Sequence, residues 1–206
     1  MLTSPLLDGL PWLEHGFGTR AGPLTQEGMV SLKQIHSSLS LVADRPEGCV
    51  GEGDALITAE PGRTVSVRTA DCFPILLADP RHRAVAAVHA GWRGTAARVV
   101  IETLRRMRVE FGTEPSDLWA AIGPGIGACC YHVGADVARR FGMDGAGRLD
   151  LAAENIRQLA EAGVQPVRID HLQACTSCDA ERFHSWRRDH HEAGRMISFI
   201  AVHAQA

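Results

Sequence analysis

The chain has 206 residues, of which 45% are hydrophobic and 22% are charged, and its formal net charge is -3. This length allows one domain with a substantial core, and the composition is ordinary for a globular enzyme or binding domain. The small net charge excludes the basic surface typical of nucleic-acid-binding proteins, and no apolar run reaches the roughly 18 residues of a membrane-spanning helix. The first residues also lack the basic and apolar regions of a signal peptide. We therefore expect one domain over residues 1–206, located in the cytoplasm, without nucleic-acid or membrane partners.

The amino-terminal third contains short apolar stretches separated by turn residues. The first 13 residues include Pro5 and Pro11 and predict a loop or edge segment. Residues 45–53 are rich in Gly and Pro and predict a loop. A short strand is expected within residues 14–20, which end in a turn that displays Arg20. Residues 31–36 suit a strand or a short helix, and further short strands are expected over residues 54–58 and 64–68. His36 stands alone in this region, and a lone histidine is more often hydrogen-bonded or solvent-facing than a metal ligand.

Residues 69–94 form the stretch around which the chain is organised. Two apolar strands flank a tight turn at Asp79-Pro80, so the pattern predicts an antiparallel hairpin. The start of its first strand and the end of its second come together, and Cys72 and His89 should be neighbours. A thiol beside an imidazole suits a metal site, a nucleophile with its base, or two buried residues that happen to meet.

The second half alternates helices and strands, which favours a mixed α/β or α+β fold. Thr95 is expected to cap a helix that runs to about Phe111 and ends at Gly112. The glycine-rich residues 123–134 lack the GxGxxG spacing of a dinucleotide site, although their backbone N–H groups suit an anion. Strands are expected over residues 118–122, 167–170 and 196–202, and helices over residues 134–141 and 150–162.

The six cysteines are expected to be reduced in the cytoplasm, which favours metal binding or catalysis over disulfides. They stand at Cys49, Cys72, Cys129, Cys130, Cys175 and Cys178. Cys175 and Cys178 have the CxxC spacing of zinc or redox motifs, but a single such pair is a weak signal. Cys129 and Cys130 would complete four thiolates, yet adjacent cysteines are awkward ligands, so a structural zinc ion there is the less favoured interpretation.

Five motifs together resemble those of one bacterial protein family. They are QIH at residues 34–36, TADC at 69–72, HAGWRG at 89–94, IGPGIGACCYHVG at 122–134, and FHSWRRD followed by GR within 183–195. The family has been called laccase-like polyphenol oxidase and peptidoglycan editing factor, and is linked to purine nucleoside phosphorolysis. The chain departs from the family's usual pattern at Gly18, where the family often has serine, and at His132, where it often has glutamate. It also departs at residues 183–190, which read FHSWRRDH where the family often has FFSYRRDG.

The resemblance implies a layered α/β/β/α sandwich, related to bacterial cysteine-hydrolase toxins, that forms a single catalytic domain. By motif match, His36, Cys72 and His89 bind one zinc ion. The implied reactions are phosphorolysis of adenosine, inosine, guanosine or methylthioadenosine to base and sugar 1-phosphate, together with adenosine deamination. The expected partners are purine nucleosides and phosphate, and the chain is expected to be a monomer or homodimer.

Three protein ligands and one open position are typical of catalytic zinc sites, where bound water becomes acidic. Phosphorolysis also needs cations that hold phosphate behind C1′. We assign this role to Arg93, with Arg20 or Arg188 as helpers, and proton transfer to Asp71 or an ordered water.

Two other enzyme classes stay open at this point. A copper-dependent polyphenol oxidase is disfavoured because the sequence has no His-X-His pair, although a Cys-His site would bind copper adventitiously. A Cys-His hydrolase or amidase acting on peptidoglycan precursors would use Cys72 as nucleophile and His89 as base. A non-enzymatic partner-binding protein is a third alternative, for which the sequence shows no long charged or apolar patch.

Overall fold

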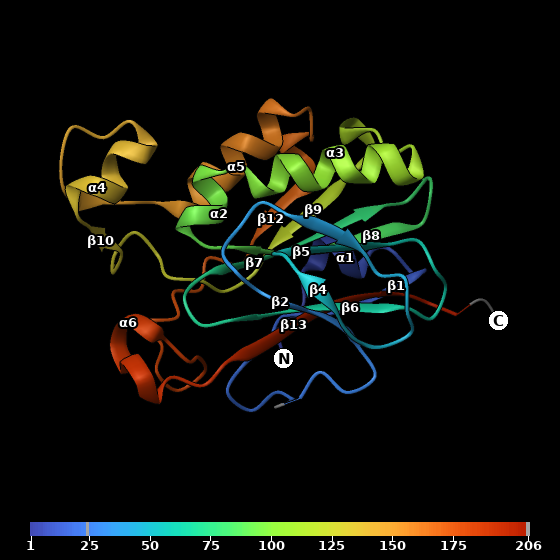
Figure 1. The fold of residues 1–206 in the computed structure, drawn as a ribbon, viewed down its shortest axis with the longest axis horizontal. Coiled ribbons are helices and arrows are strands. Elements are labelled where there is room, and N and C mark those ends of the chain that lie inside the picture. The colour runs from blue at the N-terminus through green and yellow to red at the C-terminus, as the bar shows by residue number, and fades with distance from the viewer. Residues whose placement is uncertain (24, 205–206) are drawn as a thin grey trace.

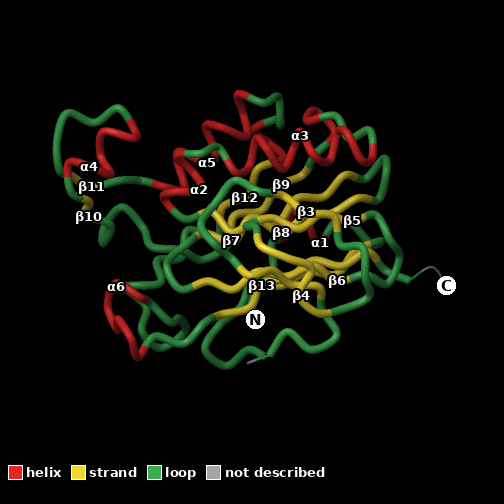
Figure 2. The backbone as a smooth tube through the Cα atoms, viewed as in Figure 1, coloured by secondary structure: helices red, strands yellow, loops and turns green. Residues whose placement is uncertain are grey.

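Two β-sheets stacked face to face form the centre of the computed structural model, which describes residues 1–23 and 25–204 (Figures 1 and 2). Helices α2 (Trp92–Ala96), α3 (Val99–Phe111) and α5 (Leu151–Glu161) cover the outer face of the larger sheet. The expected mixed α+β class is confirmed. Beside the smaller sheet the described residues form only short helices, such as α6 (Trp186–Asp189), so the second helical layer of the expected sandwich is slight.

The larger sheet has six strands in the order β12-β9-β7-β8-β5-β3. Its strands are β12 (Ile169–His171), β9 (Trp119–Ile122), β7 (Phe73–Asp79), β8 (Ala84–Ala90), β5 (Ala55–Thr58) and β3 (Ser40–Val42). The two outer pairs are parallel and the central pairs are antiparallel. Strands β7 and β8 form the predicted hairpin, in which Phe73 pairs with Ala90 and Pro74 with His89.

The smaller sheet has five strands in the order β1-β13-β6-β2-β4. They are β1 (Leu13–Gly16), β13 (Met196–Val202), β6 (Thr64–Thr69), β2 (Val30–Lys33) and β4 (Gly48–Glu52). Strand β13 lies between β1 and β6 and is antiparallel to both. The remaining α-helices among the described residues are α1 (Pro5–Asp8) and α4 (Ala135–Ala138), and the remaining strands, β10 (His132–Val133) and β11 (Gly147–Arg148), form a small antiparallel pair. In this described part of the chain, four 3-10 helices cover Pro115–Asp117, Arg139–Phe141, Pro166–Arg168 and His190–Glu192.

Burial of the central hairpin on both faces explains its continuous apolar sequence. Every residue of β7 and β8 is buried. Alternate side chains such as Ile75 and Val88 pack in the helix-side core, whereas Leu76 and Ala87 pack in the core between the sheets. Since side chains alternate along a strand, His89 shares the inter-sheet face of β8 with Ala87. The hairpin thereby directs this imidazole into the space between the sheets.

Two sequence predictions are wrong in instructive ways. The helix expected from Thr95 to Phe111 is two helices, because Arg98 between them adopts a left-handed φ of 61°. The apolar spacing continues through the break, so periodicity could not reveal it. Residues 45–53 include strand β4, an edge strand that pairs with β2 in parallel despite its glycines. The expected end of α3 at Gly112 is confirmed.

Candidate metal centre

Three side chains from separate parts of the chain meet at one end of the β7-β8 hairpin. His36 lies in the turn after β2, Cys72 directly precedes β7, and His89 is the penultimate residue of β8. One ligand atom from each lies within 4.8 Å of the others. The two imidazole rings meet edge to face at a centroid distance of 4.9 Å. The predicted proximity of Cys72 and His89 is confirmed, and His36, which the family resemblance assigns to the same site, lies beside them.

A buried carboxylate, Asp54, orients two of these three donors. Its Oδ1 lies 2.8 Å from Nδ1 of His89, and the Asp54 side chain is fully buried. A carboxylate accepts this bond from an Nδ1–H, so Nε2 of His89 is the ring nitrogen that can bind a metal ion once it has lost its own proton. The same arrangement of carboxylate behind histidine is typical of metal sites.

Asp54 also holds the turn that carries His36. Its carboxylate accepts hydrogen bonds from the backbone N–H of His36 at 3.0 Å and of Ser37 at 2.5 Å, and from the Ser37 hydroxyl at 2.8 Å. His36 has a left-handed φ of 59°, a conformation that such bonds help to stabilise. Sequence reasoning missed Asp54, and the only available signal was an aspartate at the start of a fully buried strand.

Cys72 and His89 strongly shift each other's pKa. Burial would raise the pKa of Cys72, but charged His89 and hydrogen bonds from both histidines outweigh it and lower that pKa to about 6. Burial would lower the pKa of His89, but the Cys72 thiolate and Asp54 outweigh it and raise that pKa to about 9. In the metal-free protein the pair is therefore a thiolate and an imidazolium near neutral pH.

Gly91 permits the close packing of these donors. A Cβ atom at this position would lie 2.7 Å from Sγ of Cys72 and 3.3 Å from Cδ2 of His36. The first distance is shorter than side chains tolerate, so the glycine of the HAGWRG motif leaves space that the site needs.

Three hydrogen bonds hold Asp71, the residue that we assigned to proton transfer. Its Oδ1 accepts the Thr176 hydroxyl at 2.7 Å, and its Oδ2 accepts the backbone N–H of Arg187 at 2.6 Å. Its carbonyl oxygen accepts the N–H of Ile126 at 2.8 Å. Asp71 directly precedes Cys72, so these bonds connect the loop after β9, the loop after β12 and helix α6 to the metal centre.

The three arginines assigned to phosphate have different surroundings. Arg93 is exposed and its guanidinium stacks on the Trp92 ring at 4.4 Å. Arg188 uses all five of its side-chain N–H donors on three backbone carbonyls and on Asp189. Arg20 donates to a carbonyl and to the same Asp189. In this conformation the Arg93 guanidinium can contact an anion, whereas all the side-chain donors of Arg188 are used in hydrogen bonds within the protein.

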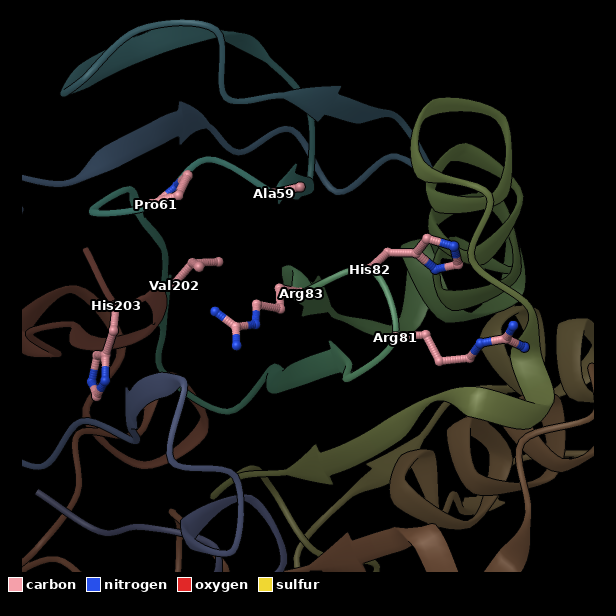
Figure 3. Close-up of a pocket in the computed structure, with 7 residues that line it drawn as sticks. All are labelled: Ala59, Pro61, Arg81, His82, Arg83, Val202 and His203. Atoms are coloured by element: carbon pink, nitrogen blue, oxygen red, sulfur yellow. The ribbon is translucent and has the colours of Figure 1, made fainter. Parts of the chain in front are cut away.

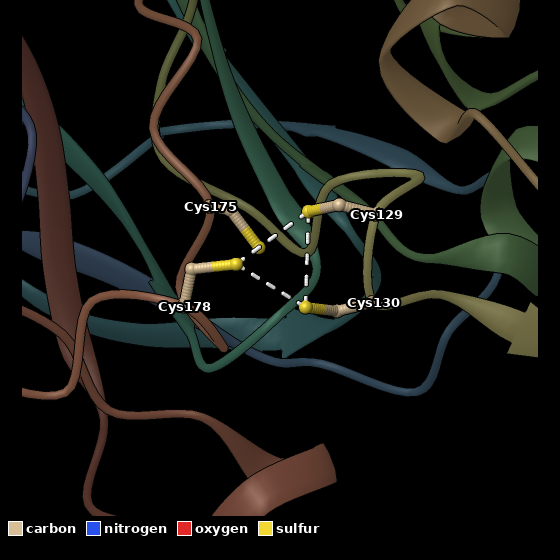
Figure 4. Close-up of side chains that lie close together, drawn as sticks. All are labelled: Cys129, Cys130, Cys175 and Cys178. Carbon is tan, nitrogen blue, oxygen red and sulfur yellow. Dashed lines mark hydrogen bonds between the residues drawn. The ribbon is translucent and has the colours of Figure 1, made fainter.

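A hollow of about 260 Å³ lies at the opposite end of the hairpin and is not part of this site (Figure 3). It is lined by Arg81, His82 and Arg83 of the β7-β8 turn and by His203, among others. A second hollow, of about 320 Å³, lies beside Phe73, Cys129 and Cys175. The four cysteines of the second half of the chain converge there in a cluster of their own (Figure 4).

Comparison with known proteins identifies the family of this chain and supports its fold. A family model described as multi-copper polyphenol oxidoreductase laccase matches residues 18–203. The chain belongs to this laccase family. The crystal structure of YlmD from Geobacillus stearothermophilus superposes with a TM-score of 0.89 at 27% identity, covering 97% of this chain and 94% of that one. This laccase-family chain and YlmD therefore share one fold along almost the whole length of both chains.

Two relatives in the laccase family have names that describe an activity. A protein named purine nucleoside phosphorylase from Clostridium acetobutylicum is 40% identical over 179 residues, which are 82% of this chain and 75% of the relative. A protein named adenosine deaminase RL5, from an unknown prokaryotic organism, is 34% identical over 175 residues, which are 78% of this chain and 66% of the relative. The relatives' names favour an enzyme that processes nucleosides. In the described residues, no helix is long and apolar enough to cross a membrane.

Proposed function

We propose that this chain is a zinc-dependent purine nucleoside phosphorylase with adenosine deaminase activity. The observation that carries the proposal is the convergence of His36, Cys72 and His89 in front of the buried Asp54 carboxylate. The names of relatives at about 40% identity support purine nucleosides and phosphate as substrates. Adenosine, inosine, guanosine and methylthioadenosine are the nucleosides to test. Free thiols at the centre suit a cytoplasmic, reducing compartment.

The donor set fits zinc. Two imidazoles and one thiolate are common zinc ligands, and three protein ligands are the number found in catalytic sites. A zinc ion bound there supplies a Lewis acid with an exchangeable fourth position. Copper would bind the same donors, because Cu(II) forms tighter complexes than Zn(II) with most such sets. Because the sequence has no His-X-His pair, any oxidase activity of copper-loaded protein would come from adventitiously bound copper.

In phosphorolysis a phosphate oxygen forms a bond to C1′ of the sugar while the bond from C1′ to purine N9 breaks. The electron pair of the broken bond moves onto the purine, which takes up one proton. We assign phosphate binding to Arg93, the exposed arginine within the HAGWRG motif. Proton delivery is assigned to Asp71 or to a water that it holds. In deamination, water adds to C6 of adenine and ammonia leaves.

A second candidate function rests on the metal-free charge state. A Cys72 thiolate beside a His89 imidazolium that Asp54 orients is the arrangement of a cysteine hydrolase or amidase. In such an enzyme Sγ of Cys72 would form a bond to an acyl carbon of a peptidoglycan precursor while the bond from that carbon to its amide nitrogen breaks. The His89 imidazolium would give the leaving amine its proton, and water would then release the acyl group from sulfur as a carboxylic acid. A thiolate bound to zinc is a poor nucleophile, so metal content separates the two functions.

The deciding experiment combines metal analysis with product chromatography. Protein prepared without added metal is incubated with adenosine, with and without phosphate, alongside Cys72→Ala and the matched control Cys49→Ala at an exposed, distant cysteine. We expect the wild type to release adenine only when phosphate is present. Cys72→Ala should lose this activity and one zinc ion per chain, whereas Cys49→Ala should keep the activity and the zinc. Metal-free protein without nucleoside turnover, but with a thiol at Cys72 that iodoacetamide alkylates rapidly, would instead support the hydrolase.

A further inference from the structure

Four cysteine side chains outside the site described above converge on one point. Cys129 and Cys130 lie in the turn after β9, and Cys175 and Cys178 lie in the loop after β12. Their four sulfur atoms all lie within 4.8 Å of one another (Figure 4). The two segments are held side by side by an isolated parallel bridge between Gly125 and Cys175.

The sulfur spacing matches a tetrahedral zinc site. Zinc–thiolate bonds of about 2.3 Å place neighbouring sulfurs about 3.8 Å apart at the corners of a tetrahedron. Sγ of Cys129 lies 3.7 Å from that of Cys130 and 3.6 Å from that of Cys178, and the separation between Cys130 and Cys178 is 3.3 Å. An increase of about 0.1–0.5 Å brings these three separations to the tetrahedral spacing. The fourth sulfur, Sγ of Cys175, lies within 4.8 Å of the other three.

The backbone around the cluster is shaped for thiolate ligands. The N–H of Gly127 donates to Sγ of Cys175 at 3.2 Å, a bond of the kind that supports metal-bound sulfur. A Cβ atom at Gly127 would lie 3.2 Å from Sγ of Cys129 and 3.3 Å from Cβ of Cys175, so glycine allows both to approach. The Gly127 carbonyl accepts the N–H of Cys130 and closes the turn that presents two adjacent sulfurs to the same side. In this turn two adjacent cysteines can therefore bind the same metal ion.

We propose that Cys129, Cys130, Cys175 and Cys178 bind one zinc ion in a closed tetrathiolate site with a structural role. Four protein ligands leave no open position for a substrate, in contrast to the three donors at His36, Cys72 and His89. The convergence of all four sulfurs on one centre, rather than in two separate pairs, distinguishes this site from a pair of disulfides.

The tetrathiolate site stabilises the surroundings of Cys72 from a distance. Its two segments include Ile126 and Thr176, and both donate hydrogen bonds to Asp71, the residue before Cys72. A metal ion that ties these segments together holds the Asp71 contacts in place. Loss of the ion is therefore expected to loosen the loop after β9 and the loop after β12 together.

Zinc analysis of full-length variants tests the site. We expect two zinc ions per chain in the wild type, one in Cys178→Ser, one in Cys72→Ala, and two in the control Cys49→Ser. Zinc X-ray absorption of Cys72→Ala should show four sulfur neighbours at about 2.3 Å. If the proposed function fails and the His36 site binds no metal, the wild type still holds one zinc, which Cys178→Ser removes and Cys72→Ala does not.

Thiol reactivity provides a second measurement on the wild type, so the test does not depend on a variant that folds. A chelator should expose these four thiols to a disulfide reagent when it removes the tetrathiolate zinc, and should expose a fifth, that of Cys72, when it also removes a zinc ion bound to His36, Cys72 and His89. Unchanged zinc content in a correctly folded Cys178→Ser protein would overturn the proposal. Disulfides among the four cysteines in protein purified without air would also overturn it.

Discussion

The Oδ1 atom of Asp54 lies 2.8 Å from Nδ1 of His89, and both side chains are buried. This contact gives the imidazole a fixed orientation, while the other bonds of the same carboxylate hold the His36 turn. One buried residue outside the group of His36, Cys72 and His89 thereby fixes the positions of two of its members.

Replacing Asp54 with Asn should weaken metal binding. The amide cannot accept all the hydrogen bonds that the carboxylate accepts, and loss of a carboxylate behind a ligand histidine typically costs about 10–100-fold in metal affinity. Competition with a chromophoric chelator measures this change. Asp117→Asn, which removes only the surface ion pair with Arg81, is the control and should keep the wild-type affinity. Equal affinities for the two variants would show that Asp54 does not orient the donors.

Gly91→Ala should disturb the donors without removing any of them. The new Cβ would lie 2.7 Å from Sγ of Cys72, so the thiol or the backbone must shift. Overpacking of this kind costs about 1–3 kcal/mol, and we expect reduced zinc content and turnover together. Gly145→Ala, where no atom lies within 4 Å of the place that the new methyl group would take, serves as the control. Wild-type zinc content in Gly91→Ala would contradict the assigned packing.

Arg93→Ala should raise the KM for phosphate by at least about tenfold, because a charge-assisted hydrogen bond contributes about 1.5–3 kcal/mol. The KM for nucleoside should change much less. Initial rates at varied phosphate concentration measure the effect, with Arg105→Ala on the exposed side of α3 as the control. An unchanged phosphate dependence would remove Arg93 from this role.

Asp79, buried at the end of β7, should make stability depend on pH. Burial opposes its ionisation, but hydrogen bonds from the His82 ring and from the backbone of Arg81 and His82 outweigh it and lower the pKa below the ordinary 3.8. The unfolded chain therefore binds a proton more readily, and the stabilisation is present above pH 3.8 and is lost as the pH falls through the folded-state pKa.

Asp79→Asn should accordingly lower the free energy of unfolding by about 1–3 kcal/mol at pH 7, the cost of breaking a buried hydrogen-bond set. The difference from the wild type should shrink below about pH 4. Urea unfolding at pH 7, 5 and 3 measures it, with the exposed Asp44→Asn as the control. A difference that stays constant with pH would mean that ionisation of Asp79 is not its source.

Local patterns were enough to predict the hairpin and the meeting of Cys72 with His89, because the register of two strands joined by a short turn is a local property. His36 needed a family resemblance, since the contact depends on how the two sheets stack. Asp54 was missed for a different reason: its contact with His89 depends on the pairing of β5 with β8, two strands that are separated in the sequence by β6 and β7. The cysteine cluster was underestimated because the bridge between Gly125 and Cys175 joins segments that are distant in the sequence.

The position of β13 has a consequence for folding during synthesis. This strand lies between β1 and β6, yet it is made long after both of its neighbours. Until it leaves the ribosome, β1 and β6 have unpaired edges that face each other across a gap, and exposed strand edges promote association with other chains. We expect the growing chain to depend on chaperones until β13 inserts and completes the smaller sheet.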